Sequence, residues 1–219
     1  MDKKNLITRT LSGAVIVLVF VSSIMLLRPL FYVVMLFVTI MMLLEWYNMT
    51  KDSLIANLFG VILIPLSSAS LLIISQLDEL GWLLLTFFSL IWMVDVNAML
   101  SGKLIGGPKL APRLSPNKTI SGLVIGVFGA TIIVNILSMI PGYQLPHLFL
   151  NSHFSLSIFC LIMGSIAQLS DLLVSYFKRR FKIKDTGSII PGHGGFLDRF
   201  DSIILTAPIT ALYLISHYR

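Results

Sequence analysis

Seven long apolar runs divide this chain, and they constrain its fold more than any other feature. They cover residues 11–27, 30–48, 55–74, 80–98, 120–140, 154–176 and 201–216. A helix that crosses the hydrocarbon core of a bilayer needs about 17–25 mostly apolar residues. The sequence therefore predicts an all-α, polytopic integral membrane bundle of about seven transmembrane helices.

The composition excludes a water-soluble globular protein. Apolar residues make up 56% of the 219 positions and charged residues only 12%, whereas soluble domains carry about 25% charged residues. Too little polar sequence remains to cover a large soluble core. The single Cys160 lies inside an apolar run, so no disulfide forms within the chain. The first run is predicted to be a retained span, because Arg28-Pro29 and a second run follow it without a small-residue cleavage site.

The basic residues predict the orientation of the spans. With the N-terminus in the cytoplasm, only Arg28 and Arg219 fall on the opposite side, and cytoplasmic segments carry an excess of Lys and Arg. The cytoplasmic set is Lys3, Lys4, Arg9, Lys51, Lys103, Lys109, Arg113, Lys118, Lys178, Arg179, Arg180, Lys182, Lys184 and Arg199. This basic face suits anionic headgroups or a phosphorylated soluble ligand. We expect no nucleic-acid partner, because no nucleic-acid-binding module is recognisable.

The runs and loops divide the chain into two parts. Residues 1–90 are predicted to form N-terminal membrane helices. Residues 91–219 are predicted to form catalytic membrane helices with two polar cytoplasmic loops, 99–119 and 177–200.

One face of the sixth predicted span is polar. Gln168, Asp171, Ser175 and Lys178 recur at intervals of three and four, so they share one helix face. Asp171 lies about 10 Å below the cytoplasmic end, and a carboxylate there is costly unless it is paired, hydrated or bound to a cation. A purely structural ion pair with a Lys or Arg is the alternative interpretation.

A glycine-rich stretch precedes the last span. "PGHGG" (191–195) favours an irregular backbone whose free N–H groups can converge on an anion. Asp198 and Asp201 follow at i, i+3 and would share a face where the seventh helix begins. Asp201 could instead cap that helix, and His193 could either donate to a phosphate or be an ordinary loop residue.

These groups together suit phosphoryl or nucleotidyl transfer. Asp171 and Asp198 could supply the carboxylates that Mg²⁺ takes alongside substrate phosphates. Basic side chains at 178, 179 and 184 could neutralise phosphate oxygens. "SPNKT" (115–119) reads as a Pro-braced turn at a helix start that could bind a triphosphate. Its lysine, Lys118, could otherwise be an ordinary cytoplasmic lysine. No Ser or Cys has a convincing nucleophile–base setting, which argues against a hydrolase.

Two segments carry a resemblance to a known family. "SYFKRRFKIKDTGSIIPGHGGFLDRFD" (175–201) and "DVNAMLSGKLIGGPKLAPRLSPNKTISG" (95–122) resemble the signature segments of the phosphatidate cytidylyltransferases, also called CDP-diacylglycerol synthases. The resemblance covers residues 95–122 and 168–202, and Ser170 stands where the family has a glycine.

The resemblance implies that CTP and phosphatidic acid give CDP-diacylglycerol and pyrophosphate in phospholipid biosynthesis. It also implies Mg²⁺, with room for a second cation, a homodimer, and a bacterial inner-membrane location with the site facing the cytoplasm. The implied catalytic residues are Asp171, Asp198, Lys178, Arg179 and His193, and the implied metal ligands are Asp171, Asp198 and Asp201. The implied substrate-binding residues are Ser115, Lys118, Thr119, Ser175, Lys184, Asp185, Gly192, Gly194, Gly195 and Arg199.

Two other functions remain open at this point. A CTP-using lipid kinase, such as one acting on a polyprenol, would also bring nucleotide to the membrane surface. A transporter would use Asp171 as an intramembrane ion site, but it predicts broken helices near mid-membrane. The Gly/Pro-rich elements here lie in the cytoplasmic loops instead.

Overall fold

A computed structural model describes residues 3–25, 27–78, 80–140, 143, 149, 152–190 and 194–217 of the chain. Its elements, in chain order, are α1 (Lys3–Met25), α2 (Arg28–Thr50), α3 (Leu54–Leu77), α4 (Trp82–Leu104), β1 (Lys109–Ala111), β2 (Ser115–Thr119), α5 (Ile120–Leu137), α7 (His153–Arg180), α8 (Leu197–Phe200) and α9 (Ile203–His217). Each of the predicted spans falls on one of these helices.

Among the residues that the structure describes, five helices are long and apolar enough to cross a membrane: α2, α3, α4, α5 and α7. Gly13–Met25 of α1 and Ile203–His217 of α9 are shorter apolar helices. The protein is therefore a mostly helical, polytopic membrane protein. α2 begins at Arg28-Pro29, where a break between the first two spans was predicted. Pro is tolerated in the first turn of a helix but not in its interior.

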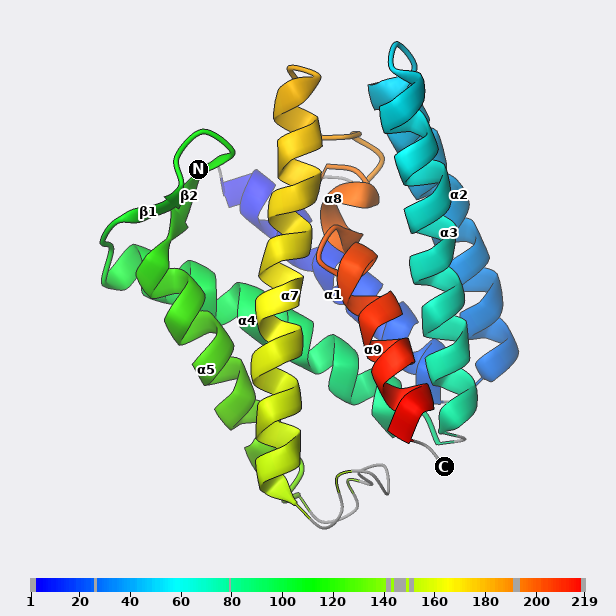
Figure 1. Cartoon of the computed structure of the whole chain (residues 1–219), viewed down its shortest axis with the longest axis vertical. Helices are drawn as coiled ribbons and strands as arrows, with labels where there is room; N and C mark the ends of the chain where they lie inside the picture. Colours follow the sequence, from blue (N-terminus) through cyan, green and yellow to red (C-terminus); the bar gives the residue numbers. More distant parts are fainter. Residues whose placement is uncertain are drawn as a thin grey trace.

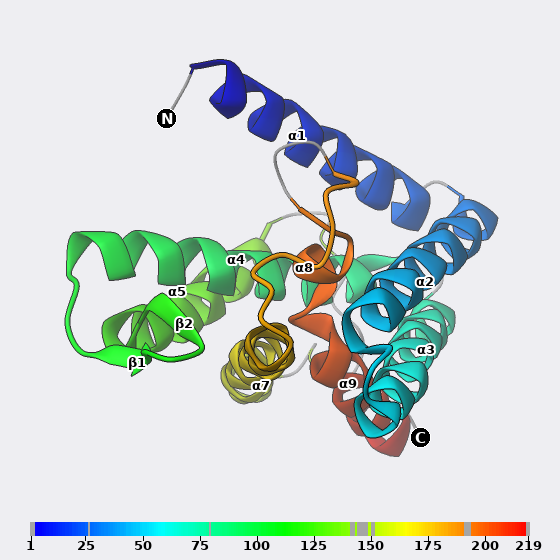
Figure 2. The ribbon, with the colours of Figure 1, turned by 90° about the horizontal axis from the view of Figure 1, so that it is seen from above.

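The helices form two groups with α7 between them. α3 packs against α2 and α9, α4 packs against α5, and α7 contacts both α5 and α9 (Figures 1 and 2). α1 crosses one side and contacts α2 and α4. Because α7 touches both groups, its polar face lies where side chains from both can converge.

Small residues let α5 approach α4 closely. A β-carbon on Gly126 would lie 2.9 Å from the Ala98 side chain and 3.0 Å from the Val94 carbonyl oxygen. Ala130 is completely buried on the same helix. These small residues of α5 therefore pack within the chain, and Gly126 brings α5 close to α4 at Val94 and Ala98.

The cytoplasmic loop predicted over 99–119 is shorter and more ordered than expected. α4 continues to Leu104, and β1 pairs with β2 in an antiparallel hairpin. The all-α prediction and the interpretation of "SPNKT" as a turn are therefore corrected, since these residues form strand β2. Pro116 is compatible with this strand because a two-stranded ribbon leaves each strand a free edge, where no N–H is needed.

Candidate functional site

A large polar cleft lies beside α7. Its volume is 930 Å³, and its walls come from α4, the β1–β2 hairpin, the start of α5, the C-terminal half of α7, the segment after α7, and residues 198–201. Many predicted site residues line it, namely Ser115, Lys118, Thr119, Asp171, Ser175, Lys178, Arg179, Lys184, Asp185, Asp198, Arg199 and Asp201. The structure thus brings together two predicted segments that are more than 50 residues apart in the sequence.

A chain of hydrogen bonds crosses the cleft from α4 to α7. Gln168 donates through Nε2 to Asp95 Oδ1 at 2.9 Å, and its Oε1 accepts from Lys118 Nζ at 2.9 Å. Lys118 Nζ also lies 2.5 Å from Asp171 Oδ2, and Ser175 donates to Asp171 Oδ1 at 3.2 Å. The Lys118–Asp171 pair realises the ion-pair alternative for Asp171, but in an open cleft rather than in a closed helix contact.

A second ion pair lies about two helical turns further along α7. Lys178 Nζ is 2.9 Å from Asp198 Oδ1 and 3.8 Å from Asp201 Oδ2. Asp198 Oδ2 accepts the backbone N–H groups of Thr186 at 2.8 Å and Gly195 at 3.0 Å. Every oxygen of this carboxylate is therefore engaged by a donor.

The surroundings of Asp198 favour its charged form. Burial by itself would raise its pKa, but the Lys178 ammonium and the two backbone donors outweigh burial and hold the pKa of Asp198 below its usual value. Asp198 is consequently an anion at neutral pH, with a fixed orientation.

The last helix does not begin at Asp198 and run through Asp201, as predicted. α8 ends at Phe200, and α9 begins at Ile203. Ser170 on α7 bonds to the backbone on both sides of this break. Its hydroxyl donates to the Asp201 carbonyl and accepts a hydrogen bond from the Leu205 N–H. Ser170, which replaces a family glycine, thus satisfies backbone groups that the break would leave unpaired.

The basic residues at the cleft mouth have different surroundings. Arg179 donates to the Leu114 carbonyl and to the Ile183 carbonyl, each at 3.1 Å, so it ties the β1–β2 hairpin to the segment after α7. Lys184 and Arg199 are exposed and line the cleft. Both therefore place a positive charge on a solvent-exposed part of the cleft wall.

The glycine turn shapes the site rather than lining it. Gly194 has a φ of +85°, which is in the left-handed region that favours glycine. Neither Gly194 nor Gly195 lines the cleft, and the Gly195 amide is already donated to Asp198. The phosphate nest expected for this stretch stays a prediction. Gly192 and His193 lie outside the described residues.

Sequence reasoning missed two acidic residues. In the sequence, Asp95 is only the first residue of the family-like segment 95–122, and nothing there indicates a role for its side chain. In the structure, this side chain lines the cleft. Glu45 on α2 is buried and accepts hydrogen bonds from the turn that holds Asp198. The sequence alone could have indicated a role for Glu45, because it is the one charged residue in the predicted span 30–48.

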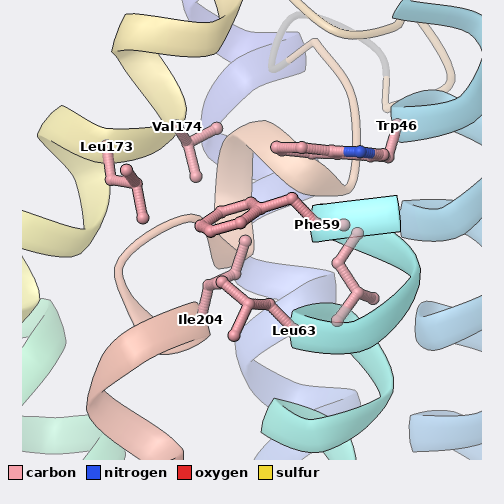
Figure 3. Close-up of a pocket in the computed structure, with 8 residues that line it drawn as sticks. Trp46, Phe59, Leu63, Leu173, Val174 and Ile204 are labelled. Carbon is pink, nitrogen blue, oxygen red and sulfur yellow. The ribbon is translucent and has the colours of Figure 1, made fainter. Parts of the chain in front are cut away.

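A second hollow is much smaller than the cleft and is lined by apolar side chains. It lies between α2, α3, α7 and α9, and Trp46, Phe59, Leu63, Leu173, Val174 and Ile204 line it (Figure 3). Its polar lining is nil and it has no room for a water molecule. This hollow is a packing seam between α7 and the helix group of α2, α3 and α9, and the polar cleft is the candidate site.

The cleft can be tested for its fit to a divalent cation. Among the residues that the structure describes, no three His, Cys, Asp or Glu side chains gather into a complete metal site. The carboxylates instead pair with lysines: Asp171 pairs with Lys118, and Asp198 and Asp201 both lie near Lys178. Mg²⁺ normally takes only one or two carboxylates and completes its coordination with substrate phosphates and water. The hard oxygen donors of the cleft fit that ion in type and number.

Comparison with known proteins points to one family. The model of the Cytidylyltransferase family matches residues 50–217. A protein of Rickettsia bellii named phosphatidate cytidylyltransferase is 49% identical over 208 residues, which is 95% of this chain and 90% of the relative. Proteins with the same name from Rickettsia felis, 49% identical over 98% of this chain and 94% of the relative, and from Brucella suis, 33% identical over 70% and 55%, also match.

Proposed function

This chain belongs to the cytidylyltransferase family, and we propose that it transfers CMP from CTP to phosphatidic acid, giving CDP-diacylglycerol and pyrophosphate. One observation carries the proposal. The family match spans every residue that lines the polar cleft, and near-full-length relatives with about half of their residues identical are named for this activity.

The chemistry asks the protein to hold two anions together. An oxygen of the phosphatidate phosphate attacks the α-phosphorus of CTP, the bond from that phosphorus to the β-phosphate oxygen breaks, and pyrophosphate leaves. The nucleophile is already an anion near neutral pH, so no strong general base is needed. Lys118, Lys184 and Arg199 line the cleft and would offset the phosphate charges.

The cofactor belongs to the proposal as well. Asp171, Asp198 and Asp201 would hold Mg²⁺, with room for a second cation, together with substrate oxygens. When bound, the ion supplies charge neutralisation at the reacting phosphates. We expect a chelator to abolish activity and added Mg²⁺ to restore it, while chelation leaves the melting temperature of substrate-free protein unchanged.

We further propose the membrane arrangement. Seven spans with a cytoplasmic N-terminus would place the cleft at the cytoplasmic face of a bacterial inner membrane, where CTP arrives from one side and lipid from the other. Fourteen of the 16 Lys and Arg residues support this orientation. An Arg113→Cys, Cys160→Ala variant should react with an impermeant maleimide in inverted vesicles only. The homodimer that the family resemblance implies is tested by light scattering of purified protein.

The deciding assay uses purified protein in detergent with CTP, Mg²⁺ and phosphatidic acid. CTP labelled in the α-phosphate should place its label in lipid, whereas CTP labelled in the γ-phosphate should place its label in pyrophosphate. In a parallel reaction with a polyprenol in place of phosphatidic acid, transfer of the γ-label to the polyprenol with release of CDP would show the lipid-kinase activity instead. No transfer of either label would overturn the proposal.

A further inference from the structure

Glu45 is a buried carboxylate in an apolar helix. It lies on α2, five residues before the helix ends, and only 3% of it is exposed. Within the described part of the chain it forms no ion pair with Lys, Arg or His. A buried carboxylate without a cation is strongly unfavourable unless it accepts several hydrogen bonds. Its position therefore requires a specific set of donors.

Those donors come from the segment that follows α7. The N–H of Phe196 donates to Glu45 Oε1 at 2.9 Å, and the N–H of Leu197 donates to Oε2 at 2.9 Å. The hydroxyl of Thr186 also donates to Oε2, at 2.8 Å. Glu45 thus connects two points of this segment that lie about ten residues apart.

The same segment holds Asp198. Thr186 donates its hydroxyl to Glu45 and its backbone N–H to Asp198. Gly195 donates its N–H to Asp198, and the next two N–H groups donate to Glu45. Glu45 and Asp198 therefore share the donors at Thr186 and residues 195–197, and any shift of these residues away from Glu45 also moves the donors that orient Asp198.

The contact between Glu45 and the turn leaves little space. A β-carbon on Gly187 would lie 2.7 Å from Glu45 Oε1, and a β-carbon on Gly195 would overlap the carboxylate. Glycines at both positions let the backbone lie directly against Glu45. Such close packing of a charged acceptor against backbone donors produces a fixed geometry rather than a loose association.

We propose that Glu45 is a positioning residue for the transfer reaction and acts through Thr186 and residues 195–197 to orient the Asp198 carboxylate. This inference rests on the proposed function. Glu45 does not line the cleft, so it does not touch substrate. Its role is to keep Asp198 oriented toward the cleft, where it would hold the cation beside the reacting phosphates, while Lys178 balances the charge of Asp198.

Glu45→Gln is the most direct test. It preserves the shape of the side chain but replaces one acceptor oxygen with an NH₂ group, which then faces a backbone N–H. A misplacement on the order of 1 Å can lower turnover by about 100-fold, so we expect kcat to fall by about 10- to 100-fold. The KM for CTP should stay unchanged, because Lys118, Lys184 and Arg199 are untouched. Glu45→Asp keeps a charged acceptor and should recover part of the loss.

A matched control separates positioning from general stability. Asp78 is another carboxylate that caps a helix start, since it accepts the N–H groups of Leu80 at 3.0 Å and Leu83 at 2.7 Å at the beginning of α4. Asp78→Asn should lower the melting temperature while kcat stays at the wild-type value. An equal fall in kcat for Asp78→Asn and Glu45→Gln would show mere destabilisation and overturn the proposal.

Two further readouts keep every outcome informative. Hydrogen–deuterium exchange at the amides of 186 and 195–197 should speed up in Glu45→Gln and not in Asp78→Asn. If Glu45→Gln does not fold, Thr186→Val removes the hydroxyl bond but keeps the N–H to Asp198, and it should lower kcat severalfold. Wild-type turnover in the folded variant tested overturns the role of Glu45. Inactive wild-type protein would overturn the proposed function instead, and the exchange data would still test the turn.

Discussion

Two lysine–aspartate pairs lie on the same face of α7, and they differ in almost everything except composition. In the Lys118–Asp171 pair, the side chains are each 20% exposed and come from β2 and α7. In the Lys178–Asp198 pair, the side chains are 10% and 4% exposed, and two backbone N–H groups fix the carboxylate. The first pair faces the open cleft, whereas the second is enclosed.

The difference indicates a division of labour. An ion pair that solvent reaches contributes little to stability and can exchange partners readily. A buried pair is costly to break because the remaining charge loses its partner. We therefore expect the outer pair, Lys118–Asp171, to open when substrates enter. The inner pair, Lys178–Asp198, should hold the walls of the cleft together. The predictions below test this comparison.

Asp198→Asn should have the largest effect. Turnover should fall by about 1,000-fold, in the range seen for loss of a group that stabilises the reacting charge. The substitution also leaves Lys178 buried with only Asp201 nearby, so unfolding should become easier by about 3 kcal/mol. Turnover in the α-label assay and thermal melting in detergent measure the two effects. A melting temperature equal to that of the wild type would show that the inner pair is not structural.

Asp171→Asn should separate activity from stability. We expect turnover to fall by about 100-fold, whereas the free energy of unfolding should change by less than about 1 kcal/mol, since the pair is partly solvated. The same two measurements apply. A loss of stability as large as that of Asp198→Asn would remove the distinction between the two pairs.

Sequence patterns predicted the helices well because apolar length and helical period are local properties. Every predicted span lies on a helix, and Gln168, Asp171, Ser175 and Lys178 do share one face that lines the cleft. What the patterns missed depends on contacts between distant segments. The β1–β2 hairpin exists because two strands pair, and "SPNKT" alone carries no sign of its partner.

The pairing of charges in the site was also beyond local patterns. Nothing near Lys118 in the sequence indicates that it meets Asp171 rather than solvent. Nothing near Glu45 indicates that it accepts hydrogen bonds from Thr186 and Phe196. Both partners lie more than 50 residues away, so only the packing of α7 against its neighbours decides them. The roles assigned to the site residues stay predictions that the variants described here test.

Lys118→Met should have a smaller effect than either aspartate change. It removes one cation from the nucleotide side of the cleft and leaves Asp171 with its Ser175 hydrogen bond. A charge-assisted contact is worth about 1.5–3 kcal/mol, so the KM for CTP should rise by about 10- to 100-fold, and kcat should fall less. Initial-rate kinetics over a CTP series check this. A fall in kcat with unchanged KM would place Lys118 outside nucleotide binding.

Ser175→Ala should have the smallest effect. It tests whether the outer pair includes a functional group beyond Lys118 and Asp171. Its hydroxyl donates to Asp171 Oδ1 at 3.2 Å, a long bond to a carboxylate that Lys118 already pairs with on its other oxygen. Loss of one such hydrogen bond costs about 1 kcal/mol, so turnover should fall by roughly fivefold with no change in melting temperature. Combined with Asp171→Asn it should add nothing, because the two side chains act through the same carboxylate. An additive loss would mean that Ser175 contacts substrate directly, and the outer pair would then include a third functional group.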